Sequence, residues 1–212
     1  MTEIRENIKS LTLKNGKSYT VRNNRDRFFF PDEWMKFNEI LKKNQKFTFD
    51  FLINTGSRIN EARNVRVNDC DLERKRIVLR ITKVKARKGE KHPRPRMIPI
   101  STQFAKYLKK YIKNTKLKED NYFPILSTPA ANIAMKKGLQ RAGIKDYYMF
   151  SIHNIRKTLE TWLMALDIDG LKITSHIGHS MAVAAGSYVS ADVFSWEEKK
   201  QIRMIIGDLY QR

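Results

Sequence analysis

One stretch of the sequence, residues 47–63, reads FTFDFLINTGSRINEAR and predicts two consecutive helices. Its phenylalanine, leucine and isoleucine residues give the first helix a buried face. Gly56 is placed to end that helix in a left-handed conformation. A short helix from Arg58 to Arg63 follows, so Arg58 projects from a helix N-terminus and Glu61 lies one turn further on. The stretch therefore predicts a helical core that presents an arginine at a helix end.

Before this stretch, the sequence divides into a basic arm and the start of the ordered domain. Residues 1–27 are rich in Lys and Arg and have few apolar residues at a steady period. We expect these residues to be an arm or linker and residues 28–212 to be one domain. The aromatic cluster Phe28–Phe30 begins that domain, and Pro31 opens a helix with an apolar face (Trp34, Phe37, Ile40 and Leu41).

After the stretch, the pattern predicts a hairpin and then helices. Residues 76–82 (RIVLRIT) and 96–100 (RMIPI) predict two antiparallel strands. Ser101 caps a helix, and Thr128 caps another that has Pro129 in its first turn and Gly143 just past its end. Further helices follow at about 152–166, with a buried face of Ile155, Leu159, Trp162 and Leu163, and after the capping box of Ser195 and Glu198. We expect an α+β, mainly helical fold with a small antiparallel sheet.

Composition restricts the partners and the chemistry. The chain has 212 residues and a formal net charge of +20, which favours a polyanionic partner and first of all nucleic acid. The single cysteine excludes a disulfide framework or a zinc site of paired cysteines. No run approaches the roughly 20 apolar residues of a membrane span. We expect an intracellular protein without metal or cofactor.

The basic charge is concentrated in the predicted hairpin. Between Arg74 and Arg96, eleven residues are Lys or Arg and only Glu90 is acidic. Like charges on paired strands repel one another unless phosphate groups lie between them. We therefore expect the hairpin to contact DNA, through Arg80, Lys85, Arg87, Lys88, Lys91 and Arg94.

Three segments carry groups suited to phosphodiester chemistry. The first is TGSRINEAR at 55–63, the second is HNIRKT at 153–158, and the third is HIGHS at 176–180 with Tyr188 nine positions after His179. Arginine binds phosphate through its planar, permanently charged fork. His153 and Arg156 are three apart on a helix and face the same way. His176 also lies three residues before His179, but two histidines without a nearby Cys or carboxylate cluster make a poor zinc site.

In this order and spacing, the three segments resemble the catalytic domain of the tyrosine recombinase (phage integrase) family, from about residue 28 to residue 212. Asn154, Lys157 and Ile177 are mild departures from the family pattern. The high Lys and Ile content is similar to that of archaeal and archaeal-virus integrases.

The resemblance implies a role for each matching residue. Tyr188 attacks the scissile phosphate to form a 3′-phosphotyrosyl bond, Arg58 and Arg156 bind the non-bridging oxygens, and His153 and His179 complete the hydrogen bonds. His153 is the preferred base for Tyr188, and Glu61 orients the arginines. The family also uses a hairpin lysine as general acid. Counting from the first strand selects Lys83, counting back from the second favours Lys85, and Lys88 precedes the turn glycine.

The resemblance also implies double-stranded DNA as substrate and a homotetramer on paired sites, with a monomer in free solution. Family members usually carry a helical domain before the catalytic one, so this chain is either a fragment or a minimal enzyme, and we expect weak, salt-sensitive DNA binding by the monomer. Two alternatives remain: a type IB topoisomerase, which uses nearly the same groups, and a non-catalytic DNA-binding relative. The helix after Ser195 either covers its own core or packs into a neighbouring protomer.

Overall fold

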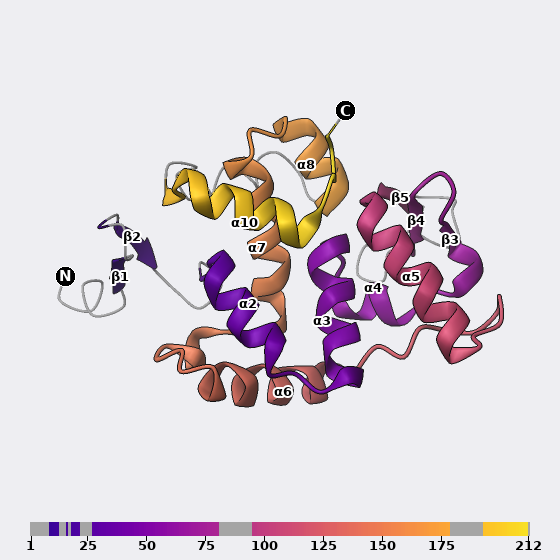
Figure 1. Ribbon diagram of the computed structural model, residues 1–212, viewed down its shortest axis with the longest axis horizontal. Coiled ribbons are helices and arrows are strands. Elements are labelled where there is room, and N and C mark those ends of the chain that lie inside the picture. Colours follow the sequence, from indigo (N-terminus) through magenta and orange to yellow (C-terminus); the bar gives the residue numbers. More distant parts are fainter. Residues whose placement is uncertain are drawn as a thin grey trace, which may run out of the picture.

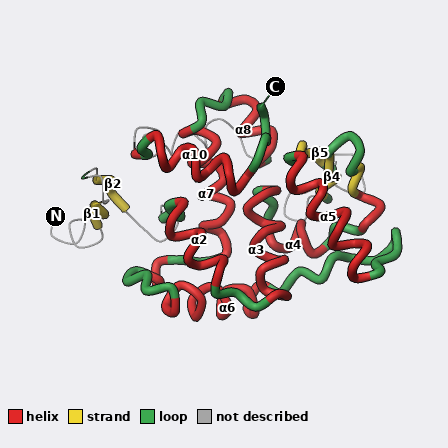
Figure 2. The backbone as a smooth tube through the Cα atoms, in the orientation of Figure 1, coloured by secondary structure: helices red, strands yellow, loops and turns green. Residues whose placement is uncertain are grey.

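The structure, a computed structural model, describes residues 9–12, 16, 18–21, 27–80, 95–178 and 193–211. Helices dominate this part of the chain, and short strands form two antiparallel sheets (Figure 1 and Figure 2). The predicted α+β, mainly helical fold is confirmed. The helices are α2 (Pro31–Glu39), α3 (Lys43–Thr55), α4 (Ile59–Arg63), α5 (Thr102–Thr115), α6 (Thr128–Arg141), α7 (Ile152–Ala165), α8 (Gly170–Ile177) and α10 (Trp196–Ile206).

The larger sheet has three strands, one more than the sequence predicted. β4 (Arg76–Leu79) lies between β3 (Cys70–Asp71) and β5 (Arg96–Pro99), and both neighbours are antiparallel to it. Ile77 is opposite Ile98, and both side chains are fully buried. β3 has only two residues, which is too short for an alternating pattern. In the predicted arm, β1 (Lys9–Thr12) pairs with β2 (Ser18–Val21).

Helix α7 forms the centre of the helical part. It contacts α3, α6, α8 and α10 (Figure 1). The four apolar residues that were predicted to face the core, Ile155, Leu159, Trp162 and Leu163, are completely buried. Because α7 is enclosed in this way, the polar residues near its N-terminus have a fixed position relative to α3.

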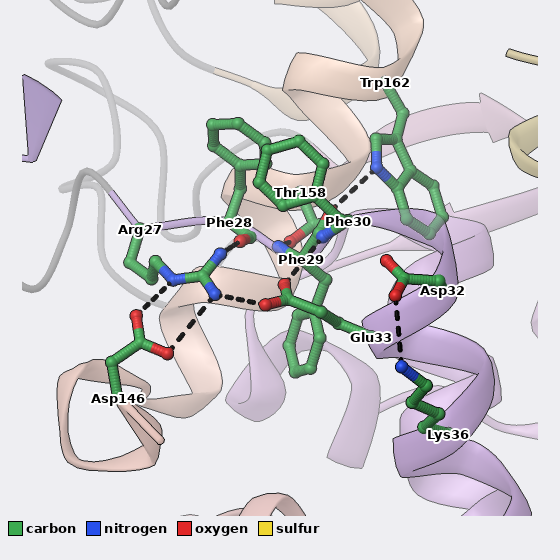
Figure 3. Close-up of polar contacts among 10 residues, drawn as sticks. All are labelled: Arg27, Phe28, Phe29, Phe30, Asp32, Glu33, Lys36, Asp146, Thr158 and Trp162. Carbon is green, nitrogen blue, oxygen red and sulfur yellow. Dashed lines mark hydrogen bonds and ion pairs between the residues drawn. The ribbon is translucent and has the colours of Figure 1, made fainter. Parts of the chain in front are cut away.

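Hydrogen bonds between the backbone of residues 27–30 and side chains of α7 hold this segment against the helix (Figure 3). The Phe29 N–H donates to the Thr158 hydroxyl over 2.9 Å, and the Trp162 indole N–H donates to the Phe29 carbonyl over 3.0 Å. The Asn154 amide donates to the Arg27 carbonyl over 2.6 Å. Side chains of α7 therefore satisfy the backbone of a buried extended segment.

Arg27 is buried although it stands at the end of the predicted arm. Its guanidinium pairs with Glu33 at 2.5 Å and with Asp146 at 2.7 Å (Figure 3). The guanidinium also lies 4.5 Å from the centre of the Phe150 ring. Two carboxylates and an aromatic face together compensate for removing the guanidinium from water. Arg27, the last residue of the predicted arm, is thus fixed to both α2 and the loop before α7.

The helix ends follow the predictions with two exceptions, one at the start of α6 and one at the end of α2. Ser101 caps α5 and Ser195 caps α10 as predicted. Ser127, and not Thr128, caps α6, because its hydroxyl accepts the Ala130 N–H. Helix α2 ends at Glu39, so that Ile40 lies beyond the helix and is 39% exposed. None of the described helices has the length and apolar character needed to cross a bilayer.

Candidate active site

Arg58 lies where α3 ends and α4 begins. Gly56 ends α3 with a φ of 57°, as predicted, and the chain then turns into α4 with Arg58 at the N-cap. The Glu61 carboxylate accepts from the Arg58 backbone N–H at 3.0 Å and from its Nη1 at 2.9 Å. These bonds orient the Arg58 side chain. Because this side chain remains 26% exposed, it is accessible to a ligand.

Glu61 also binds an arginine that the sequence motifs do not place in the site. Arg96, the first residue of β5, donates from Nη1 to Glu61 Oε1 at 3.2 Å and from Nη2 to Oε2 at 2.9 Å. The Glu61 carboxylate is fully buried. Burial alone would raise the pKa of Glu61, but the hydrogen bonds and charge of Arg96 and the hydrogen bonds from Arg58 outweigh it, so this pKa lies below its ordinary value. Glu61 is therefore a fixed anion between two guanidinium groups.

Arg156 reaches the same place from α7. Its Nη1 donates to the Gly56 carbonyl at 2.8 Å, while its Nη2 is buried and has no hydrogen-bond partner among the described residues. Burial, together with the charges of Arg58 and Arg96, lowers the pKa of Arg156 to about 9. A buried guanidinium beside two others is relieved by an anion that accepts its unused N–H groups.

A small cavity connects these groups. Its volume is about 200 Å³, and it lies between the start of α4 and the starts of α6 and α7. It is lined by Ser57, Arg58, Ile59, Asn60, Thr128, Ile152, His153 and Arg156. The structure thus brings Arg58, His153 and Arg156 together. The spacing in the sequence placed His153 and Arg156 on one helix face, and the family resemblance added Arg58. His153 is exposed, one helical turn before the buried Arg156.

Other predicted site residues lie outside the described residues. These are His179, Tyr188, Lys83, Lys85, Arg87, Lys88, Lys91 and Arg94. The last described residue before His179 is Gly178, which has a φ of 77°. A Cβ atom at Gly178 would lie 2.8 Å from Arg96 Nη1, so the backbone there passes directly against the arginine cluster. The positive φ favours glycine here, and a Cβ atom would require the Arg96 guanidinium to shift.

Arg80, at the end of β4, is the one predicted DNA-contacting residue of the hairpin that the structure describes. Its side chain is half exposed and forms an ion pair with Asp69. The bond to Asp69 raises the pKa of Arg80. The Asn64 carbonyl accepts a second hydrogen bond from Arg80 at 3.3 Å.

His176 is completely enclosed behind the site. Its two ring nitrogens lie 2.9 Å from the Tyr210 hydroxyl and 3.1 Å from the Thr55 carbonyl oxygen. Burial lowers the pKa of His176 to about 3, so the ring is neutral. Within the described parts of the chain, no three His, Cys, Asp or Glu residues are grouped as a metal site would require.

This fold is that of tyrosine recombinase catalytic domains. The sequence profile of the Phage integrase family matches residues 27–193. The chain belongs to this family.

Comparison with individual proteins gives distant relatives. "Tyrosine recombinase XerA" of Thermococcus onnurineus (strain NA1) is 24% identical over 180 residues, which cover 81% of this chain and 59% of that protein. The chain therefore spans about three fifths of the length of this curated relative.

Two solved structures are similar in fold. A XerA recombinase crystal structure has a TM-score of 0.58 and 18% identity, over 84% of this chain and 64% of that one. A XerH site-specific recombinase bound to its difH substrate has a TM-score of 0.60 and 17% identity, over 90% of this chain and 58% of that one.

Proposed function

We propose that the chain is the catalytic domain of a site-specific DNA recombinase that cleaves and rejoins strands through a 3′-phosphotyrosyl bond to Tyr188. The observation that supports this most is the cavity shared by Arg58, His153 and Arg156, with the buried Nη2 of Arg156, which has no hydrogen-bond partner in the part of the chain that the structure describes. A tetrahedral phosphate supplies the acceptor oxygens that this nitrogen lacks. Family membership and the net charge of +20 support the same function.

In the proposed reaction, the Tyr188 oxygen attacks the scissile phosphorus and the bond to the 5′ oxygen breaks. His153 takes the tyrosine proton, and a hairpin lysine, with Lys83 ahead of Lys85 and Lys88, protonates the leaving 5′ oxygen. Arg58 and Arg156 stabilise the charge on the non-bridging oxygens. His179 completes the hydrogen bonds to the phosphate. A 5′-hydroxyl of a partner strand then attacks the phosphotyrosine and releases Tyr188.

Two further groups orient the arginines in this proposal. Glu61 binds Arg58 twice and Arg96 twice, so it fixes the Arg58 guanidinium relative to the sheet. The Gly56 carbonyl fixes Arg156. Preorganised donors of this kind need no rearrangement when charge develops in the transition state. The proposed reaction needs no metal ion or organic cofactor.

The proposed partner is double-stranded DNA inside the cell, in the cytoplasm or nucleoid. Recombination exchanges strands between two duplexes, so the proposed active assembly is a homotetramer on paired sites, formed from free monomers. The basic residues of the hairpin, including Arg80, would contact the phosphates next to the cleavage site. Binding should weaken steeply as salt concentration rises.

The test uses a library of duplexes with randomised sequence, each with a nick close to the candidate cleavage position so that cleavage traps the product. Wild type and Tyr188→Phe are incubated with the library in EDTA and separated on a denaturing gel. The proposal predicts a covalent protein–DNA band in wild type that is absent in Tyr188→Phe. A band of equal intensity in both proteins would contradict it.

The same proteins on a supercoiled plasmid test the topoisomerase alternative. Relaxation of supercoils by wild type, without any requirement for a second site, would favour a type IB topoisomerase. Duplex binding without covalent complexes on any sequence would favour a non-catalytic DNA-binding relative.

A further inference from the structure

The segment that follows α10, residues Gly207–Gln211, is fixed to two other elements. The Asp208 carboxylate accepts from the Thr102 backbone N–H at 2.6 Å and from its hydroxyl at 2.5 Å, which joins the segment to the start of α5. Tyr210 then reaches His176 on α8. Tyr210 has a φ of 62°, an uncommon backbone conformation for a bulky residue that the surrounding contacts must hold.

The contacts of His176 define its tautomer. A carbonyl oxygen only accepts hydrogen bonds, so the Nε2 atom that faces the Thr55 carbonyl carries the proton. In a neutral ring, Nδ1 is then an acceptor, and the Tyr210 hydroxyl donates to it. Burial raises the pKa of Tyr210 to about 12, which keeps this donor protonated. The Lys172 carbonyl, at 3.5 Å from the Tyr210 oxygen, is a much poorer acceptor.

His176 in turn contacts the end of α3 from which the candidate site is built. Thr55, whose carbonyl it binds, is the last residue of α3, and the next carbonyl, that of Gly56, holds Arg156. A Cβ atom on Gly56 would lie 2.7 Å from Ile177 and 3.7 Å from the His176 ring. The turn that leads into Arg58 is therefore packed directly against α8.

We propose that Tyr210 and His176 are positioning residues of the recombination site, and that they act by fixing the turn from Thr55 to Arg58. The chain of contacts runs from Tyr210 to His176, to the end of α3, and from there to Arg156 and Arg58. This inference rests on the proposed function. It assigns a role in strand cleavage to Tyr210, which lies 34 positions after His176 and does not line the cavity.

The test compares wild type with Tyr210→Phe, which removes only the hydroxyl. Single-turnover cleavage of the trapping duplex gives the rate, and titration with uncleaved duplex gives the affinity. A small displacement of catalytic groups slows the reaction far more than it weakens binding to an extended duplex, so we expect cleavage to slow roughly tenfold or more with duplex affinity unchanged. Equal cleavage rates in the two proteins would overturn the proposal.

A control variant separates positioning from general stability. Ile206→Val removes one methyl group from the buried side of α10, beside the same segment, and leaves every hydrogen bond of His176 in place. We expect Ile206→Val to lower the melting temperature while its cleavage rate remains that of wild type. If Ile206→Val slowed cleavage to a similar extent, lost stability alone would explain the slowing in Tyr210→Phe, and the proposal would be overturned.

A second readout does not depend on cleavage. Inorganic phosphate should raise the melting temperature of wild type by binding the arginine cluster, and should raise that of Tyr210→Phe less. If wild type cleaves no DNA, the proposed function fails, and phosphate binding alone then decides the positioning role. Equal phosphate affinity in wild type and Tyr210→Phe would overturn it.

Discussion

Arg96 donates two hydrogen bonds to the Glu61 carboxylate, at 3.2 and 2.9 Å, and so joins strand β5 to helix α4, which has Arg58 at its N-cap. The same carboxylate binds Arg58. Because Glu61 is fully buried, it acts as an internal counter-ion that allows three arginines to approach one another. The positive charge that remains is directed towards the cavity that Arg58 and Arg156 line.

Replacing Glu61 by Gln should destabilise the protein strongly. The substitution leaves three guanidinium groups close together without their shared anion, and breaking a buried pair in this way costs about 3–5 kcal/mol. Urea unfolding of wild type and Glu61→Gln measures the difference. Asp32→Asn is the control, because the Asp32–Lys36 pair is exposed and contributes about 0–1 kcal/mol. An unfolding free energy of Glu61→Gln within 1 kcal/mol of wild type would argue against the internal counter-ion.

Arg96→Met should make the protein sensitive to acid at a higher pH. In wild type the folded-state pKa of Glu61 is below its ordinary value of 4.5, so its stabilising contribution is complete above that pH and is lost as pH falls through the folded pKa. Without the hydrogen bonds and charge of Arg96, the effect of burial is less compensated, and the pKa of Glu61 in the folded state rises. Melting temperatures between pH 3 and pH 7 should therefore begin to fall earlier in Arg96→Met, and unchanged behaviour would contradict this. Arg80→Met serves as control, since Arg80 is half exposed.

Gly56→Ala and Gly143→Ala form a matched pair. Both glycines have positive φ, 57° and 74°, and a side chain in that conformation costs roughly 1–2 kcal/mol. A Cβ at Gly143 meets nothing within 4 Å, whereas one at Gly56 would lie 2.7 Å from Ile177 and 2.9 Å from Leu159. Overpacking adds about 1–3 kcal/mol, so Gly56→Ala should be the less stable variant in urea and should slow DNA cleavage. Equal stabilities of the two variants would show that the turn is not tightly packed.

Much of this arrangement could be predicted from the sequence, because it depends on local spacing. Gly56 ends α3, Arg58 starts α4, and His153 and Arg156 share a helix face, all within a few residues. The contact of Arg96 with Glu61 could not be predicted. It spans 35 residues and two elements, and in the sequence Arg96 is one of eleven basic residues in a run.

The contact of His176 with Tyr210 could not be predicted from the sequence either. The sequence placed His176 near His179 in what would be a poor metal site, but its partner Tyr210 lies 34 residues away, and the two meet because α8 and α10 both pack against α7. The capping error at α6 has a local cause. Ser127 and Thr128 are both good N-cap residues, and Pro129 is accepted in either register of the first turn.

The neutral state of His176 predicts a loss of stability in mild acid. Its folded pKa of about 3 lies below the ordinary value of 6.5, so from pH 6.5 downwards the unfolded chain binds a proton that the folded chain does not. This contributes up to about 1.4 kcal/mol per pH unit. The Tyr210 hydroxyl and the Thr55 carbonyl bind the ring, and the charges of Arg96 and Arg156 also disfavour its protonation. Urea unfolding at several pH values should show a shallower slope between pH 6.5 and pH 5 in His176→Gln than in wild type, and identical slopes would contradict this assignment.

The central claim, that Tyr188 is the nucleophile of a phosphate site built from Arg58, His153 and Arg156, is tested most directly by mapping the covalent complex. Wild type is trapped on the nicked duplex library in EDTA, digested with nuclease and protease, and the nucleotide-bearing peptide is identified by mass spectrometry. If Tyr188 is the nucleophile, we expect a 3′-phosphate-linked nucleotide on Tyr188 and no adduct in Arg156→Met. An adduct on any other residue, or an equal yield from Arg156→Met, would contradict it.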